Sequence, residues 1–457
     1  MLRRIITLLI WTVLAVSIVL ATVILVELGR GYSYDFKTGE LKLSGLVVFG
    51  SNPSGADIFA SGKTIHRRTP YRSTFEAGQY LFTITKPGYR QWSKQVTIFP
   101  SEVSWVQYVL LIPTVIKQTT ITTNPAISLL ATSTDHRHFA YVASDGAVWT
   151  FDSSLRTPSR LYQPSAPAVG QPVEQITALA WSNDASHLLI STTSGASQLS
   201  RLVNLSDGTV TKLTESFGFS FTDLRFSPNN WQVLYWLSPE GLRQINVSNQ
   251  TVSAVLADNV STYQFAGNQI VYTETTATST TLDSMGQTGQ NKRQLAKLEV
   301  SPSYQLGYST YLNTPMVAVL PSTTRTITLY KDAFSGHPTS QVVTRAADTL
   351  AFNTDGRFLN YRDGQRLATY DLEKAQTYLF EPSPQPYGVV EWFDTYHLLA
   401  ATANEISIVE YDGGNLTSIT GASLAAGVGV TDSEHSIVSV SPTKDGGFKL
   451  ISSEIKP

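Results

Sequence analysis

The sequence predicts a mainly β chain in three parts: an N-terminal transmembrane helix, a small β-sandwich and a ring of repeated four-stranded sheets. A charge-free apolar run covers residues 5–26, short strands separated by turn residues fill residues 45–113, and a repeat runs from residue 114 to residue 457. The 11% aromatic content favours strands, and the 15% charged content is low for a cytosolic enzyme.

The first element is the run from Ile5 to Val26, which is long enough to cross a hydrocarbon core of ~30 Å. Arg3 and Arg4 precede it, so the positive-inside rule predicts that residues 1–4 form a cytoplasmic stub. A cleaved signal peptide is the alternative, but the run is longer than usual and "VELGRGYSYDF" after it has no small-residue cleavage site. We expect an uncleaved signal anchor and then a linker over residues 27–44.

The second element, residues 45–113, shows five strand signals separated by "NPSG", "SGK", "EAG" and "KPGY", each of which can turn the chain. Five short strands in about 70 residues indicate a small β-sandwich. The strand signals are "GLVVFGS", "ADIFAS", "QYLFTITKP", "RQWSKQVTIF" and "VSWVQYVLL".

This segment resembles the PEGA domain. The resemblance is carried by "VVFGSNPSG", "ADIF", "GK", "TP", "GQY" and "KPGY", in this order between residues 47 and 89. The eponymous Pro-Glu-Gly-Ala reads "PSGA" at residues 53–56, a change that falls in a predicted turn. The resemblance implies an extracytoplasmic accessory β-sandwich, often tethered to a membrane, with no known catalytic residues.

Charge is unevenly distributed along the chain. Residues 45–113 hold seven Lys and Arg against three Asp and Glu, and residues 1–44 have a net charge of about +2, which leaves about −8 for the remainder. A basic module beside a membrane predicts contact with anionic lipid headgroups or wall polymers, whereas solvation of an exposed sheet is the simpler alternative. Residues 66–68 are expected to form a basic tip. The candidate envelope-contact patch comprises Lys63, His66, Arg67, Arg68, Arg72, Arg90 and Lys94.

The third element is a repeat in which an apolar strand ends in an aromatic residue and is followed by a polar turn and further strands. The period is about 40 residues, with one double-length gap filled by "STYLNTPMVAVLP". Four short strands per repeat indicate a β-propeller blade. The anchoring aromatics are Trp181, Phe226, Phe265, Phe352 and Trp392.

Counting degenerate copies at both ends predicts eight blades, with seven as the alternative. The last copy has three strand signals, and "TVIKQTTIT" from Thr114 is a surplus strand before the first copy. We therefore expect the surplus strand to complete the last blade and close the ring. The turns "SND", "SPNN" and "NTDG" resemble the WD-like repeats of TolB-type propellers.

The sequence carries no recognisable catalytic motif. Without cysteine there is no disulfide, thiolate metal site or Cys nucleophile, and neither HExxH nor G-x-S-x-G occurs. His136 and His138 are two residues apart but lie in a predicted turn, and His187 and His397 occupy equivalent strand edges. The carboxylates Asp184, Asp355 and Glu240 also fall mostly in turns. No cofactor, catalytic residue or metal ligand is predicted.

These observations favour a non-enzymatic, single-pass envelope protein with most of its chain extracytoplasmic. The sandwich is expected to be a spacer or envelope contact, and the propeller a platform for a protein, peptide or glycan partner. The near-neutral net charge of −2 shows no nucleic-acid footprint. The alternative is a propeller enzyme, a lyase or glycosidase acting on an envelope polysaccharide, which requires acidic side chains from several innermost strands to converge.

Overall fold

The computed structural model describes residues 2–29, 32–35, 39–124, 126–165, 172–364, 366–382, 387, 389–402, 405–421, 427–432 and 435–456. Of the predicted stub and linker, residues 1, 30, 31 and 36–38 lie outside this set. The chain divides into unit 1, Met1–Ile116 with Lys456–Pro457, and unit 2, Lys117–Ile455. Each unit is described by itself.

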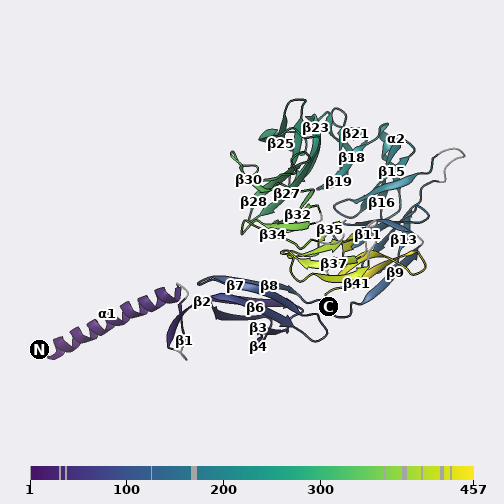
Figure 1. The fold of residues 1–457 in the computed structure, drawn as a ribbon. Helices are drawn as coiled ribbons and strands as arrows, with labels where there is room; N and C mark the ends of the chain where they lie inside the picture. Colours follow the sequence, from purple (N-terminus) through teal and green to yellow (C-terminus); the bar gives the residue numbers. More distant parts are fainter. Residues whose placement is uncertain are drawn as a thin grey trace. The chain divides into compact units, whose positions relative to one another are not determined.

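Unit 1 begins with helix α1, Leu2–Gly29, within which Leu9–Glu27 has a mean hydropathy of 2.8 (Figure 1). The window contains Leu, Ile, Val and Ala on every side and none of it is buried against protein. A helix that is apolar all round needs a protein core or a bilayer around it. By length and composition α1 can serve as a membrane anchor or as a signal sequence.

The rest of unit 1 is a two-sheet sandwich whose core includes the buried Val47, Phe49, Phe82 and Trp92. Phe49 and Phe82 meet edge to face with ring centroids 4.9 Å apart. One sheet has the order β1-β2-β5 with β8 also on β2, and the other has the order β4-β3-β6-β7. The strands are β1 Tyr32–Asp35, β2 Glu40–Asn52, β3 Asp57–Ala60, β4 Lys63–Arg68, β5 Tyr71–Glu76, β6 Gly78–Thr85, β7 Trp92–Ile98 and β8 Val103–Leu110.

The prediction of a basic loop tip at residues 66–68 was wrong, because these residues belong to strand β4. β4 is the edge strand of its sheet, and only Ile65 along it packs against the core. A strand that turns one apolar residue inward shows no alternating pattern, which is why its sequence reads as a loop.

The first and last main strands of the sandwich, β2 and β8, run parallel, from Leu46 beside Val103 to Asn52 beside Leu110. Ser44, near the start of the paired part of β2, accepts a hydrogen bond from the amide of Ser101, and Asn52 accepts one from Leu111. The chain therefore comes in at one end of the sandwich and leaves at the opposite end.

Unit 2 is a β-propeller, and the described residues form eight sheets, each named here after its first strand (Figure 1). The predicted fold class is confirmed, while the exact blade count stays a prediction. Four sheets come from the first half: β10 Ile127–Thr132, β11 His138–Ala143, β12 Val148–Asp152 and β13 Ser159–Tyr162; β14 Gln175–Trp181, β15 His187–Ser194, β16 Ser197–Asn204 and β17 Val210–Lys212; β18 Thr222–Ser227, β19 Asn230–Ser238, β20 Gly241–Asn246, β21 Thr251–Val252 and β22 Ala257–Asp258; β23 Val260–Ala266, β24 Gln269–Thr275, β25 Thr280–Gly286 and β26 Arg293–Leu298.

The second half of unit 2 repeats this arrangement, and one short helix, α2 Leu213–Phe217, interrupts the first half. Its sheets are β27 Tyr304–Tyr311, β28 Thr314–Pro321, β29 Ile327–Lys331 and β30 Thr339–Thr344; β31 Thr349–Phe352, β32 Phe358–Asp363, β33 Arg366–Asp371 and β34 Gln376–Leu379; β35 Val389–Trp392, β36 His397–Ala401, β37 Glu405–Glu410 and β38 Thr417–Gly421; and β39 Val428–Val430, β40 Ser436–Pro442 and β41 Phe448–Glu454 with β9 Gln118–Asn124.

Strand β9 completes the last sheet, as the surplus strand signal predicted. It pairs antiparallel with β41, from Gln118 opposite Ser453 to Asn124 opposite Phe448. The Gln118 side chain also donates to the Thr420 hydroxyl of the β35 sheet at 3.0 Å. The two ends of the propeller segment are therefore held in one sheet.

Successive sheets pack face to face through apolar clusters, and the anchoring aromatics explain the repeat. Trp181, Phe226 and Phe265 each pack against the sheet that precedes their own. Phe352 and Trp392 do the same, and the Trp392 indole donates to Asn360 of the preceding sheet at 2.8 Å.

The polar residue after several first strands fixes the turn into the second strand. The buried Ser182 hydroxyl accepts the His187 amide at 2.9 Å, and the Asn353 side chain accepts the Phe358 amide at the same distance. Asp184 in turn accepts from the Ser182 hydroxyl and the Ser186 amide. These turns are Asx- and Ser-type turns, in which the side chains replace backbone partners.

We predict that Gly429→Ala destabilises the contact between the last and first sheets. A Cβ at Gly429 would lie 2.1 Å from the Thr132 hydroxyl and 2.8 Å from the Phe139 ring. Overpacking of this kind costs about 1–3 kcal/mol. Chemical denaturation should show this loss, whereas the control Gly336→Ala, with open space around it, should stay within about 0.5 kcal/mol. Equal effects of the two variants would contradict the tight contact.

Candidate functional site

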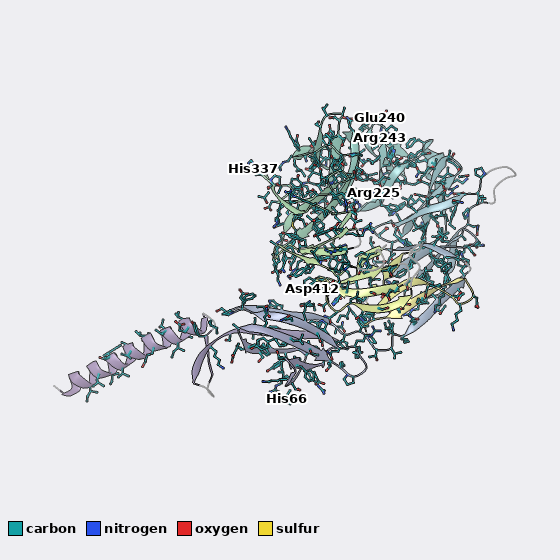
Figure 2. All side chains as sticks on the ribbon, viewed as in Figure 1. His66, Arg225, Glu240, Arg243, His337 and Asp412 are labelled. Carbon is teal, nitrogen blue, oxygen red and sulfur yellow. The ribbon has the colours of Figure 1, made fainter. Side chains whose placement is uncertain are left out.

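The structure divides the predicted basic patch between two sides of the sandwich. Lys63, His66, Arg67 and Arg68 lie on β4, and Arg72 lies on β5; both are edge strands joined directly at residues 69–70. All five are exposed, and Figure 2 shows His66 at the periphery of the sandwich.

Arg90 and Lys94 belong to the other side, near and on β7. Arg90 is exposed, and its backbone amide donates a hydrogen bond to the Ile112 carbonyl. The Lys94 ammonium lies 4.8 Å from the centroid of the Tyr108 ring. On the first side, the guanidinium of Arg68 pairs with Asp57 at 2.8 Å. The β4–β5 side therefore keeps the larger share of the basic groups.

The histidines weighed as metal ligands occupy structural positions. His136 bonds the Val430 carbonyl at 3.1 Å, and His138 lies at the start of β11 near Asp135. His187 stacks on Trp231 with ring centroids 3.7 Å apart, and His397 bonds Asp394 at 2.7 Å. Among the residues that the structure describes, no three His, Asp or Glu side chains gather as a metal site would require.

The turn carboxylates singled out from the sequence also have structural partners. Asp184 and Asp355 accept hydrogen bonds within their own turns, and Glu240 pairs with Arg243. Figure 2 shows Glu240 and Arg243 at the periphery of the propeller. None of the three points to a catalytic role.

The first strands of neighbouring sheets contact one another, as β10 does with β14 and β27 does with β31, so they form the inner wall of the ring. On β18, Arg225 pairs with Asp223 through two contacts of 2.7 Å and donates to the Tyr263 carbonyl at 2.9 Å. Arg225 thus connects two neighbouring sheets, and its charge is already neutralised.

Glu391 on β35 is an inner-wall carboxylate that the sequence analysis did not single out. Val390 and Trp392 pack on the β31 sheet, so the Glu391 side chain points to the opposite face of its sheet. Water reaches the side chain, yet protein surrounds it closely, and this desolvation raises the pKa of its carboxyl to about 7. Within the described residues it makes no hydrogen bond or ion pair.

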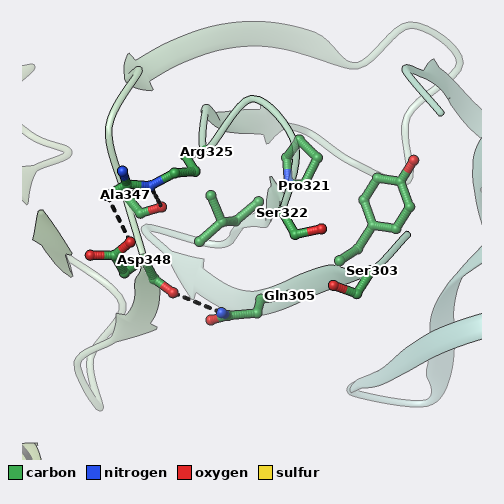
Figure 3. A pocket seen from close by; sticks show the side chains of 9 residues that line it. Ser303, Gln305, Pro321, Ser322, Arg325, Ala347 and Asp348 are labelled. Atoms are coloured by element: carbon green, nitrogen blue, oxygen red, sulfur yellow. Dashed lines mark hydrogen bonds and ion pairs between the residues drawn. The ribbon is translucent and has the colours of Figure 1, made fainter. Parts of the chain in front are cut away.

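A cavity of about 160 Å³ lies where the β27 sheet meets the β31 sheet. It is formed by the start of β27, the loop after β28 and the start of β31 (Figure 3). Its lining residues are Ser303, Tyr304, Gln305, Leu320, Pro321, Ser322, Arg325, Ala347 and Asp348.

One ion pair shapes the cavity. The Arg325 guanidinium lies 2.7 Å from Asp348 and 3.8 Å from Asp363, and Arg325 itself has a φ of +54°. The second Asp348 oxygen accepts the Gly364 amide at 2.8 Å, and the Asp348 carbonyl accepts from the Gln305 side chain at 2.9 Å. A left-handed conformation of a non-glycine residue persists only where its surroundings hold it, and the pair with Asp348 supplies one such contact for Arg325.

Sequence reasoning did not find this cavity. Ser303 and Gln305 belong to no recognisable motif, and Arg325 and Asp348 are 23 positions apart in the chain. No local motif marks loops that meet only when two sheets pack.

Comparison with known proteins confirms the resemblance to the PEGA domain and the propeller fold, whereas the TolB-like character of the repeats stays a prediction. Residues 44–112 match the PEGA domain family. No curated protein matches the chain.

Among solved structures, the Dos1 propeller has 11% sequence identity and a TM-score of 0.50, over 74% of this chain and 94% of that chain. At this identity the similarity shows the fold alone. The dihydro-heme d1 dehydrogenase NirN (13% identity, TM-score 0.49, 77% and 76% of the two chains) and a manganese-bound oligogalacturonate lyase (14% identity, TM-score 0.43, 73% and 98%) are also similar.

We predict that Glu391→Gln removes a pH-dependent loss of stability. Between about pH 4.5 and pH 7 the folded chain keeps the Glu391 proton that the unfolded chain releases, so wild-type stability falls as pH rises through this window. The stability of the variant relative to wild type should rise from pH 4.5 to pH 7 and then level off.

Denaturation at several pH values measures this difference. Glu381→Gln removes an exposed carboxylate from the same unit and serves as the control. A Glu391→Gln difference that stays constant from pH 4.5 to pH 8 would show that the Glu391 carboxyl is not desolvated.

Proposed function

We propose that this chain is a non-enzymatic, membrane-anchored extracytoplasmic protein in which the sandwich is a spacer and the propeller a binding platform. The observation that carries the proposal is the parallel pairing of β2 with β8. It makes the chain leave the sandwich at the end opposite its start, so about seven paired residues, or roughly 23 Å, separate the two connections.

The orientation follows from charge. Arg3 and Arg4, at the start of α1 and ahead of its apolar window, favour a cytoplasmic N-terminus, and the translocated remainder then carries the PEGA domain. On the sandwich, the exposed basic side chains of β4 and β5 are suited to anionic headgroups or wall polymers, since each basic group near such a surface contributes about 1 kcal/mol.

The packing of the propeller sheets and the ion pair at the cavity rim favour a binding role for the propeller. Neighbouring sheets share apolar clusters, and the Arg325–Asp348 pair connects the two segments at the rim of the cavity between the β27 and β31 sheets. Rigid loops on such a scaffold bind with little loss of conformational entropy. The partner class is a protein, peptide or glycan of the envelope.

A propeller enzyme of the lyase or glycosidase type is the second candidate. Glu391 favours it, because a carboxyl with a pKa near 7 suits general acid–base catalysis. Glycoside hydrolysis usually requires a second carboxylate nearby, whereas the pKa of Glu391 is raised by desolvation and not by a neighbouring charge.

To separate platform from enzyme, the full chain in lipid nanodiscs is incubated with immobilised envelope polysaccharides and peptides. We expect retention of at least one polymer without any new reducing ends, unsaturated sugars or peptide fragments. If a polysaccharide is degraded by the wild-type chain but not by the Glu391→Gln variant, the proposal of a non-enzymatic binding platform is wrong and the propeller is an enzyme.

We also predict that Lys63→Glu, Arg67→Glu and Arg72→Glu together weaken binding of the full chain to anionic surfaces. Three lost attractions of about 1 kcal/mol each amount to roughly a 100-fold loss. Cosedimentation with immobilised anionic wall polymer measures the effect.

The control reverses the same number of charges on exposed lysines of unit 2, Lys292, Lys297 and Lys374. Equal losses for both triple variants would mean that net charge, rather than the β4–β5 side of the sandwich, governs the contact.

A further inference from the structure

The cavity between the β27 and β31 sheets has an apolar floor and a polar rim. Tyr304, Leu320 and Ala347 are 6%, 3% and 1% exposed, and the buried Pro321 lies beside them. Ser303, Gln305 and Ser322 are exposed at the rim together with Arg325 (Figure 3). A ligand bound in this cavity would contact apolar side chains at the floor and hydrogen-bonding groups at the rim.

Several rim groups have unused hydrogen-bonding capacity. The Gln305 amide nitrogen donates to the Asp348 carbonyl, which orients the side chain and leaves its oxygen as an acceptor without a partner in the described part of the chain. The Ser303 hydroxyl also makes no hydrogen bond among the described residues. The Ser322 hydroxyl shares one contact of 3.1 Å with Ser301 and keeps further capacity. The rim therefore offers both donors and acceptors.

The two charged residues that line the cavity, Arg325 and Asp348, neutralise each other at 2.7 Å. An anionic ligand near Arg325 would meet Asp348 and Asp363, and a cationic ligand near either Asp would meet Arg325. With these partners in place, the rim favours an uncharged ligand that exchanges hydrogen bonds in both directions.

The size of the cavity sets a further limit. At about 160 Å³ it is smaller than the roughly 300–1,000 Å³ of sites for drug-sized ligands. It therefore takes one ring-sized group, and longer ligands must continue into solvent.

We propose that this cavity binds a single neutral sugar residue of a glycan chain. Such a residue has an apolar C–H face for the floor of Tyr304, Leu320 and Pro321, and hydroxyls that donate and accept at the rim. The inference rests on the proposed function of the propeller as a binding platform, and it assigns the glycan, rather than a peptide, to this cavity.

The test uses the full chain in detergent and the methyl glycosides of glucose, galactose, mannose and N-acetylglucosamine as probes. Saturation-transfer NMR and titration should show binding of at least one neutral glycoside. Glucuronate and glucosamine, which carry opposite charges, should bind more weakly than their neutral counterparts.

Two variants test the site. Gln305→Ala removes one hydrogen bond and should weaken glycoside binding about fivefold. Ser303→Phe keeps the backbone contacts of Ser303 and should abolish binding by filling the cavity. The matched control is Gln175→Ala, since Gln175 is exposed at the start of the first strand of another sheet. Thermal unfolding verifies that each variant is folded.

The outcomes separate this inference from the proposed function. Peptide retention by the platform with no binding of any glycoside would overturn the sugar site and leave the platform intact. Glycoside binding that survives both cavity variants would place the sugar elsewhere and overturn the assignment. Loss of glycoside binding in Ser303→Phe, with peptide retention unchanged, would support the sugar site in this cavity. Turnover of a polysaccharide would contradict the proposed function of the propeller as a non-enzymatic binding platform.

Discussion

The pairing of β9 with β41 is the interaction on which the propeller depends. A row of packed sheets that remained open would leave the apolar face of its first sheet and of its last sheet in water. By supplying the outermost strand of the last sheet from the start of the segment, the chain joins its two ends through a ladder of backbone hydrogen bonds. Phe139 of the first sheet and Leu450 of the last then share one apolar cluster.

The sandwich follows a different constraint, which is the direction of its strands. Because β8 lies parallel to β2, the chain cannot return to the end at which it began. An antiparallel final strand would bring both connections to the same end and remove the spacing. The two edge strands β4 and β5 are joined by residues 69–70, which places most basic side chains along one side without any clustering in a loop.

The cavity and Glu391 depend on contacts between sheets. The floor of the cavity comes from β27 and β28, while Ala347 and Asp348 come from the segment that opens the next sheet. Glu391 owes its raised pKa to desolvation at the inner wall rather than to a charged neighbour. Both features exist because propeller sheets pack face to face around a common axis.

The sequence by itself determined the features that depend on local composition or on counting. The charge-free run predicted α1, the order of turn motifs predicted the PEGA domain, and the surplus strand predicted how β9 completes the last sheet. The anchoring aromatics, such as Trp181 and Trp392, were visible because each repeat needs one large side chain against its neighbour.

Only the tertiary structure decided the features that join distant residues. It assigned Arg67 and Arg68 to an edge strand whose single inward residue, Ile65, leaves no periodic signal. It separated Arg90 and Lys94 from the basic residues of β4 and β5, brought Arg325 beside Asp348, and desolvated the carboxyl of Glu391. Desolvation and packing between sheets depend on groups that are far apart in the chain, so no local pattern encodes them.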